Sequence, residues 1–160
     1  MKRSLILIFL LLIKLTIGRA QNTIPAVNQE IINYVTSVIG KKVDRGECWD
    51  LANRALTLVH ASWDGKYKYG KLLNPKKDSI YPGDLIQFEG VQLSYTVGKS
   101  KVEEDMPHHT AIVYKVIAPE VYQIADQNNG VTGKKVGLSN FDLKNVKKGK
   151  MKFYRPVPKT

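Results

Sequence analysis

The sequence is poor in the residues that hold small exported domains and metal sites together. It contains 1 cysteine and 3 histidines in 160 residues. A single cysteine excludes an internal disulfide, so the odd thiol is a reactive group, an intermolecular partner or an inert core residue. A zinc site is disfavoured because no CxxC or HxxxH spacing exists, and because adjacent histidines on a strand point apart.

Long apolar runs are confined to the first twenty residues. A short basic start precedes an apolar stretch over residues 5–13, and the segment ends in the small residue Ala20, the layout of a secretory signal peptide. Lys14 cuts the run short of the ~20 apolar residues that a membrane-spanning helix needs. We therefore expect residues 1–20 to be a cleaved signal peptide, residues 21–160 to form one domain, and the mature protein to be secreted or periplasmic.

Acidic residues are in the minority. The chain has 14 Asp and Glu against 25 Lys and Arg, a net charge of +11, of which four positive charges fall in residues 1–20. The lysines gather in residues 66–77 and 144–152, and this distribution favours anionic partners. For an exported protein, envelope polymers are more accessible partners than nucleic acid. The alternative is that these lysines simply solvate the surface.

Apolar periodicity indicates two helices followed by strands. A first helix is expected from Thr23 as N-cap to Gly40 as C-cap, and a second, buried helix after Asp44 and Glu47, which have the spacing of a capping box. Helices first and strands later predict an α+β fold. We expect a loop over residues 98–105 and strands over residues 85–88, 91–97, 110–117, 121–126, 132–138 and 151–154.

One cysteine, one histidine and one aspartate have the order that a thiol nucleophile requires. Cys48 begins the second helix, where unpaired amides and the helix dipole lower a thiol's pKa. If residues 110–117 and 121–126 form an antiparallel hairpin, His109 and Asp126 lie at the same end of adjacent strands, and an imidazole held by a carboxylate can activate the thiol. Each residue also has a plain structural interpretation, as a core cysteine, a satisfied histidine or a turn aspartate.

Four short motifs around these residues follow one another in the order of a known family. They are Gly46-Glu47-Cys48-Trp49-Asp50-Leu51, Pro82-Gly83-Asp84-Leu85-Ile86-Gln87-Phe88, His109-Thr110-Ala111-Ile112-Val113 and Asp126-Gln127-Asn128. Over residues 44–129 the chain resembles the CHAP family, the cysteine, histidine-dependent amidohydrolases/peptidases of the NlpC-like, papain-like clan.

The resemblance implies a papain-like domain whose nucleophile helix packs on an antiparallel sheet. It implies Cys48 as nucleophile, His109 as base, Asp126 in place of the usual Glu, and an assisting Asn128, with no metal or organic cofactor. It also implies peptidoglycan amide bonds as substrate, cut by an endopeptidase or an N-acetylmuramoyl-L-alanine amidase. The family usually has Gln before the cysteine, whereas Glu47 stands here in the oxyanion region beside Cys48. A carboxylate stabilises an oxyanion poorly unless it points away.

Three aromatic residues, Trp63, Tyr67 and Tyr69, are candidates for a substrate groove, and His108 is expected on the opposite strand face from His109. We expect a monomer that binds peptidoglycan or a peptide and no nucleic acid. Two alternatives stay open. One is a thiol amidase, deamidase or acyltransferase toxin acting on another protein. The other is a catalytically silent relative that binds envelope polymers.

Overall fold

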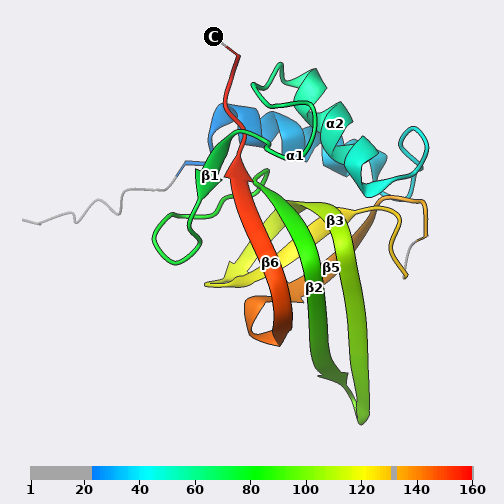
Figure 1. Cartoon of the computed structure of the whole chain (residues 1–160). Coiled ribbons are helices and arrows are strands. Elements are labelled where there is room, and N and C mark those ends of the chain that lie inside the picture. The colour runs from blue at the N-terminus through cyan, green and yellow to red at the C-terminus, as the bar shows by residue number, and fades with distance from the viewer. Residues whose placement is uncertain (1–22, 131–132, 160) are drawn as a thin grey trace, which may run out of the picture.

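Two helices lie against a six-stranded antiparallel sheet in the computed structural model, which describes residues 23–130 and 133–159 (Figure 1). The strand order is β1-β6-β2-β3-β4-β5. This arrangement confirms the α+β prediction, whereas the predicted signal peptide lies outside the described residues. The elements are α1 (Ala26–Val38), α2 (Cys48–Leu58), β1 (Lys71–Leu73), β2 (Leu85–Val97), β3 (Ser100–Ala118), β4 (Val121–Asp126), β5 (Gly137–Asp142), the 3₁₀-helix η1 (Leu143–Asn145) and β6 (Val146–Arg155).

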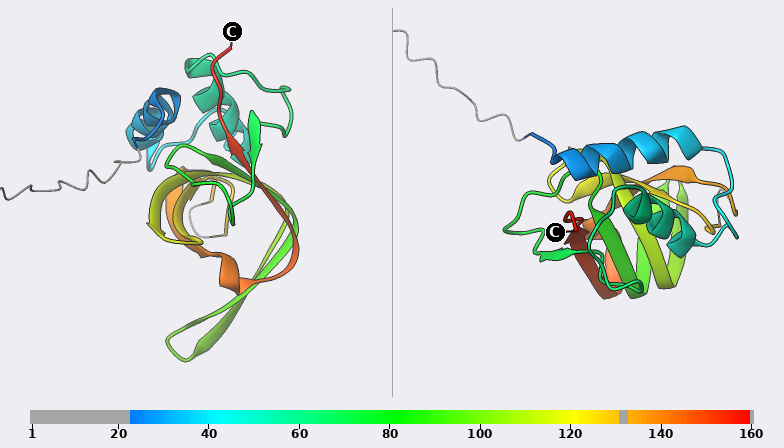
Figure 2. Two further views of the ribbon diagram at one scale, coloured as in Figure 1. Left: turned by 90° about the vertical axis from the view of Figure 1, so that its left-hand side faces the viewer. Right: turned by 90° about the horizontal axis from the view of Figure 1, so that it is seen from above.

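The sheet curls round on itself beneath the helices, as the left view of Figure 2 shows. This curl gives the chain two apolar cores. One core joins the helices to the outer face of the sheet and includes Leu56 and Ile112. The other core includes Phe88 and Phe153 and receives almost all of its side chains from the strands, so it fills the inside of the curl. Within the described residues, no helix is long and apolar enough to cross a membrane.

The helices follow the apolar periodicity, but their first turns differ from the predicted ones. α1 begins at Ala26 with Pro25 at the N-cap position, not Thr23. The buried face of α2 is confirmed, because its residues Leu51, Ala52, Ala55 and Leu56 are at most 1% exposed. The predicted Asp44–Glu47 capping box is wrong by one turn: Glu47 itself is the N-cap, and Asp50 is the third residue of the helix.

The strands are longer and less interrupted than the sequence pattern indicated. The predicted loop over residues 98–105 is wrong, since β2 and β3 pair residue for residue up to Val97 opposite Ser100 and only two residues turn between them. Charged side chains are tolerated there because this end of the hairpin is exposed to solvent. The strand expected over residues 132–138 begins instead at Gly137. The strand over residues 121–126 is confirmed.

A buried carboxylate ties α1 to the start of β2 and the end of β6. Asp84 is fully buried, and its Oδ1 accepts hydrogen bonds from Asn28 Nδ2 at 2.8 Å and Arg155 Nε at 3.1 Å. Its Oδ2 accepts from the Tyr81 backbone N–H at 2.9 Å and so caps the turn before β2. Removing one partner of such a pair leaves a buried charge uncompensated, so this contact fixes the helix layer on the sheet.

Candidate active site

Cys48 is the first residue of α2 and is partly buried at the end of the helix that faces the sheet. The loop before it is shaped by Asp50, whose carboxylate is 3% exposed. Asp50 Oδ2 accepts the backbone N–H groups of Arg45 and Glu47, each at 3.1 Å, and Oδ1 pairs with the Arg45 guanidinium. A carboxylate in the first helical turn also suits the helix dipole. The thiol is therefore held by a rigid loop.

His109 and Asp126 form a buried pair beside the thiol. His109 Nε2 lies 2.7 Å from Asp126 Oδ2, and the side chains are 9% and 2% exposed. The expected hairpin of β3 and β4 produces this contact, with Ile112 opposite Ala125 at its start. Asp126 Oδ1 accepts a second hydrogen bond from Asn129 Nδ2 at 2.6 Å. The carboxylate is thus fixed from two sides and fixes the ring in turn.

The electrostatics of the site favour a charged thiol and imidazole. Burial acts to raise the pKa of Cys48, but hydrogen bonding to His109, its charge, and the backbone N–H groups of Thr110 and Trp49 lower this pKa below its ordinary value. Burial acts to lower the pKa of His109, but Asp126 and Cys48 outweigh it and raise this pKa to about 9. Because Nε2 is engaged by Asp126, Nδ1 is the ring nitrogen left for the thiol.

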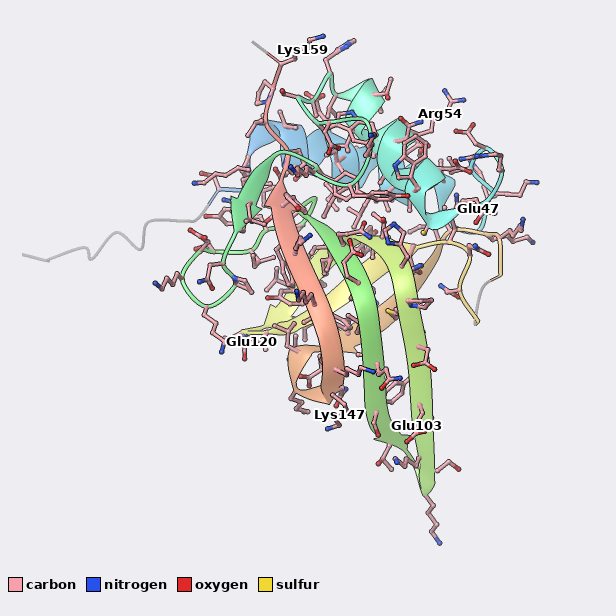
Figure 3. The ribbon with its side chains drawn as sticks, in the orientation of Figure 1. Glu47, Arg54, Glu103, Glu120, Lys147 and Lys159 are labelled. Carbon is pink, nitrogen blue, oxygen red and sulfur yellow. The ribbon has the colours of Figure 1, made fainter. Side chains whose placement is uncertain are left out.

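Glu47 lies at the start of α2 (Figure 3), and its carboxylate contacts Asn128 and Lys134. Its Oε2 accepts a hydrogen bond from Asn128 Nδ2 at 2.6 Å, and its Oε1 lies 3.3 Å from Lys134 Nζ. The lysine offsets a negative charge that would otherwise oppose a thiolate at the next residue.

The asparagine that contacts the His109–Asp126 pair is Asn129, not Asn128. Asn128 bonds Glu47 and adopts a left-handed φ of 63°, a conformation that asparagine tolerates better than most residues. Asn129 is the side chain that holds Asp126. Asn128 contacts Glu47 and Asn129 contacts Asp126, and the catalytic role implied for Asn128 stays a prediction.

Gln127 was missed by the sequence analysis although it lies within the last of the four motifs. It is fully buried, and its Nε2 donates to the backbone oxygens of Val43 at 3.0 Å and Glu47 at 2.8 Å. Its Oε1 accepts the Val43 N–H at 3.2 Å. The side chain therefore ties the end of β4 to the loop that carries Cys48. Its place directly after Asp126 was the one available signal.

A cleft of about 830 Å³ opens over the thiol. Cys48 and His109 lie at its base, the charged stretch Glu103–Asp105 of β3 forms one wall, and Tyr67 stands at the rim, 41% exposed. His108 also borders the cleft, and it lies on the opposite strand face from His109. The ring centroids of His108 and Tyr67 are 4.3 Å apart in an edge-on arrangement.

Of the three aromatic residues proposed for a groove, only Tyr67 borders the cleft. Tyr69 is fully buried, and its hydroxyl is bonded to Gln87 Oε1 at 3.0 Å and Thr110 Oγ1 at 2.9 Å. Trp63 packs between Trp49 and Tyr69, with ring centroids 5.8 and 5.9 Å apart. Tyr69 is therefore a core residue, whereas Trp63 is a partly buried ring that packs against the core, and neither lines the cleft.

Among residues 23–130 and 133–159, no group of three or more His, Cys, Asp or Glu side chains is arranged to hold a metal ion. The chemistry that these residues can perform is that of a thiol nucleophile with a paired imidazole.

The fold and this arrangement define a cysteine proteinase-fold domain of the papain-like type. The chain matches the model of the AIM3/BBC1 cysteine proteinase-fold domain over residues 21–160, and it belongs to that family. The match supports the cysteine proteinase fold. Membership of the narrower CHAP family stays a resemblance.

The chain is also similar to one curated protein and to solved structures. It is 29% identical over 166 residues to "Altered inheritance of mitochondria protein 3" of Debaryomyces hansenii. The alignment covers 86% of this chain but only 18% of that longer protein. The crystal structure of Ly7917 with the hydrolyzing product of MDP superposes with a TM-score of 0.51 at 16% identity, covering 81% of this chain and 62% of that one. Another Ly7917 structure gives 0.50 at 14% identity, covering 79% and 62%. These structural likenesses show the fold alone.

Proposed function

We propose that this domain is a cysteine hydrolase that cleaves amide bonds through an acyl-enzyme. The observation that carries the proposal is the buried His109–Asp126 pair, 2.7 Å between Nε2 and Oδ2, beside a thiol whose pKa is lowered at a helix start. Catalytic thiols lie in such electropositive, partly exposed surroundings, whereas structural cysteines are inert.

The proposed reaction has two steps. The Cys48 thiolate attacks the amide carbonyl carbon, and the C–N bond breaks as protonated His109 gives its proton to the leaving amine. This step forms a thioester and a free amine. His109 then removes a proton from water, which attacks the thioester, releases a carboxylic acid and restores the thiol. Asp126 stabilises the imidazolium and holds the ring in its tautomer throughout.

The start of α2 supplies the donors for the oxyanion. The backbone N–H of the first helical residue, Cys48, has no acceptor within its own helix and carries part of the positive end of the dipole. Glu47 cannot donate a hydrogen bond as a carboxylate, but its contacts with Asn128 and Lys134 engage both oxygens elsewhere. The oxyanion would therefore be stabilised mainly by backbone donors, each worth roughly 10²-fold or more in rate.

For the substrate we propose a peptide amide in a protein or peptide chain. A peptidoglycan substrate was the expectation from the sequence, and the Ly7917 complex keeps it as a candidate, but a likeness at 16% identity carries only the fold. The curated relative comes from a yeast, a kind of organism that makes no peptidoglycan, which favours protein substrates. Export by residues 1–20 remains part of the proposal.

The test is mass spectrometry of two substrate mixtures, purified muropeptides and a diverse peptide library, incubated with the wild-type protein in water enriched in ¹⁸O. Hydrolysis through a thioester introduces ¹⁸O into the new carboxylic acid, and the fragment masses identify the bond. Cys48→Ala should reduce turnover by roughly 10³-fold or more. The matched control is His60→Asn, which changes an exposed histidine outside the cleft. Full turnover by Cys48→Ala would overturn the proposal.

A second candidate is a silent relative that binds an anionic polymer. It is favoured by Lys148, Lys150 and Lys152, which alternate along β6 and are all exposed. The two candidates differ in the reactivity of the thiol. If Cys48 reacts with iodoacetamide no faster than a free thiol near neutral pH, and no substrate turns over, the binding function is the better account.

A further inference from the structure

A second cavity lies next to the candidate active site, inside the curl of the sheet. Its volume is about 460 Å³. The β2–β3 hairpin forms one wall, and β4, β5 and η1 form the others. The cavity exists because β3 runs beyond its partner: β4 pairs with β3 only over Ile112–Ala118, which leaves Ser100–Ala111 bonded on one side to β2 alone.

This cavity adjoins the cleft over the thiol. Four residues line both spaces: Tyr95, Glu104, Met106 and Asn129. The cavity also reaches Asp126, the acid that holds His109. A group bound there would lie beside the His109–Asp126 pair.

Apolar and polar side chains line the cavity in similar numbers, and the polar ones include Ser139, Asn140 and Asp142 of β5. Leu93, Ile124 and Phe141 line it from three strands and are at most 5% exposed. Val97 and Ile117 also line it, although they are 60% and 52% exposed. Exposed apolar residues are ordinary when scattered, but two that converge on one cavity mark a binding site.

The size of the cavity exceeds that of one amino-acid side chain. An apolar cavity of about 150 Å³ holds one benzene ring. A volume of about 460 Å³ is roughly three times larger and falls within the range of ligand sites, ~300–1,000 Å³. The shared boundary carries one carboxylate that is outside the catalytic pair, Glu104. Burial, aided by the charge of Asp126, raises the pKa of Glu104, and its side chain is bonded to Tyr95.

We propose that this cavity binds a long aliphatic chain on the acyl half of the substrate, so that the enzyme transfers a fatty-acyl group from a nitrogen of a protein or peptide chain to Cys48 and then to water. This inference rests on the proposed thiol hydrolase. The C–N bond of the N-acyl amide breaks, the amine takes a proton from His109, and water releases the fatty acid from the thioester.

The catalytic test is a series of N-acyl-7-amino-4-methylcoumarin amides from acetyl to hexadecanoyl. Each methylene that enters the cavity should raise kcat/KM, by up to about fourfold, until the cavity is full. From acetyl to dodecanoyl we expect a gain of at least ~100-fold. Equal kcat/KM for all lengths would overturn the inference and leave the proposed hydrolase intact.

Two matched variants test whether the acyl chain binds in this cavity. Val97→Lys places a charge at the cavity mouth and should reduce the dodecanoyl-to-acetyl ratio of kcat/KM at least ~10-fold. Leu72→Lys changes a side chain that is equally exposed, 61%, on β1 away from the cavity, and should keep the ratio. The same reduction in both variants, or in neither, would contradict the assignment.

A binding measurement separates this inference from the proposed reaction. Calorimetric titration of the Cys48→Ala protein with dodecanoate should show saturable binding that Val97→Lys weakens and Leu72→Lys does not. Absence of saturable binding would overturn the inference whether or not the thiol is active. Failure of every amide to turn over, with an unreactive Cys48, would overturn the proposed function, even if dodecanoate binds.

Discussion

At the scale of single residues, Glu47 places a negative charge directly before Cys48 in the sequence. A carboxylate beside a thiolate disfavours the charged thiol, and Lys134 at 3.3 Å from Glu47 Oε1 offsets that effect. Both groups are partly exposed, so solvent and salt weaken the contribution of each.

Glu47→Gln should make the thiol more reactive. Removing the charge lowers the pKa of Cys48 further, and a glutamine N–H can also donate to the oxyanion. We expect iodoacetamide alkylation at pH 6 to accelerate a few-fold. Lys134→Ala should slow it, because the charge of Glu47 is then uncompensated. Alkylation rates across pH 5–9 measure both effects, and a change in the same direction for the two variants would contradict this account.

The pH dependence of activity follows from the raised pKa of His109. Its proton is present below a pKa of about 9 and is lost as the pH rises through that value. The acid that protonates the leaving amine is then absent, so kcat/KM should fall above about pH 9. Asp126→Asn removes a contact that raises this pKa. Its alkaline limb should therefore move toward the ordinary histidine value of ~6.5, with a loss of ~10²-fold or more in kcat. An unshifted limb would argue against Asp126 as the orienting group.

At the scale of elements, the buried side chain of Gln127 joins the end of β4 to the loop before α2. Gln127 satisfies three buried backbone groups of Val43 and Glu47. The loop carrying the thiol therefore depends on a strand about eighty residues away in sequence. The catalytic helix is positioned by this contact as well as by packing.

Gln127→Ala should destabilise the fold by about 3 kcal/mol, because it leaves buried donors and acceptors without partners. The control is Gln123→Ala, a partly exposed glutamine of β4, for which we expect less than about 0.5 kcal/mol. Urea denaturation monitored by tryptophan fluorescence measures both. Equal urea midpoints for the two variants would show that the hydrogen bonds of Gln127 do not stabilise the fold.

At the scale of the whole molecule, the helix layer meets the sheet at one tight backbone contact. Gly83 has φ +86°, and a Cβ there would lie 2.5 Å from the Asn28 carbonyl oxygen and 2.8 Å from its Cα. No side chain can relieve this clash, since both atoms belong to the backbone of α1. The approach lets the side chain of Asn28 reach Asp84.

Gly83→Ala should therefore reduce the free energy of unfolding by more than the strain of a left-handed alanine alone. Gly98→Ala, at a similar left-handed φ of 61° but with nothing within 4 Å, should cost ~1 kcal/mol. We expect at least ~2 kcal/mol more for Gly83→Ala, and a thermal midpoint lower by roughly 6 °C or more, measured by circular dichroism. Comparable losses in the two variants would mean that α1 shifts away freely.

The sequence alone determined the features that depend on local pattern and order. Its apolar periodicity identified the buried face of α2, and the turn at residues 118–120 between two apolar runs predicted the hairpin that brings His109 to Asp126. The position of Cys48 at a helix start followed from the glycine before it and the periodicity after it. The catalytic roles of these three residues remain predictions.

Only the tertiary structure decided which partners lie across long distances in the sequence. It buried Tyr69 against Gln87 and Thr110, gave the contact with Asp126 to Asn129, and turned Glu47 toward Lys134. Local pattern shows that a side chain is polar or aromatic, but its exposure depends on which strands pack over it. The cavity inside the curl also depends on tertiary structure. It forms where β3 extends beyond the end of β4, and the positions of strand ends are set by pairing, not by composition.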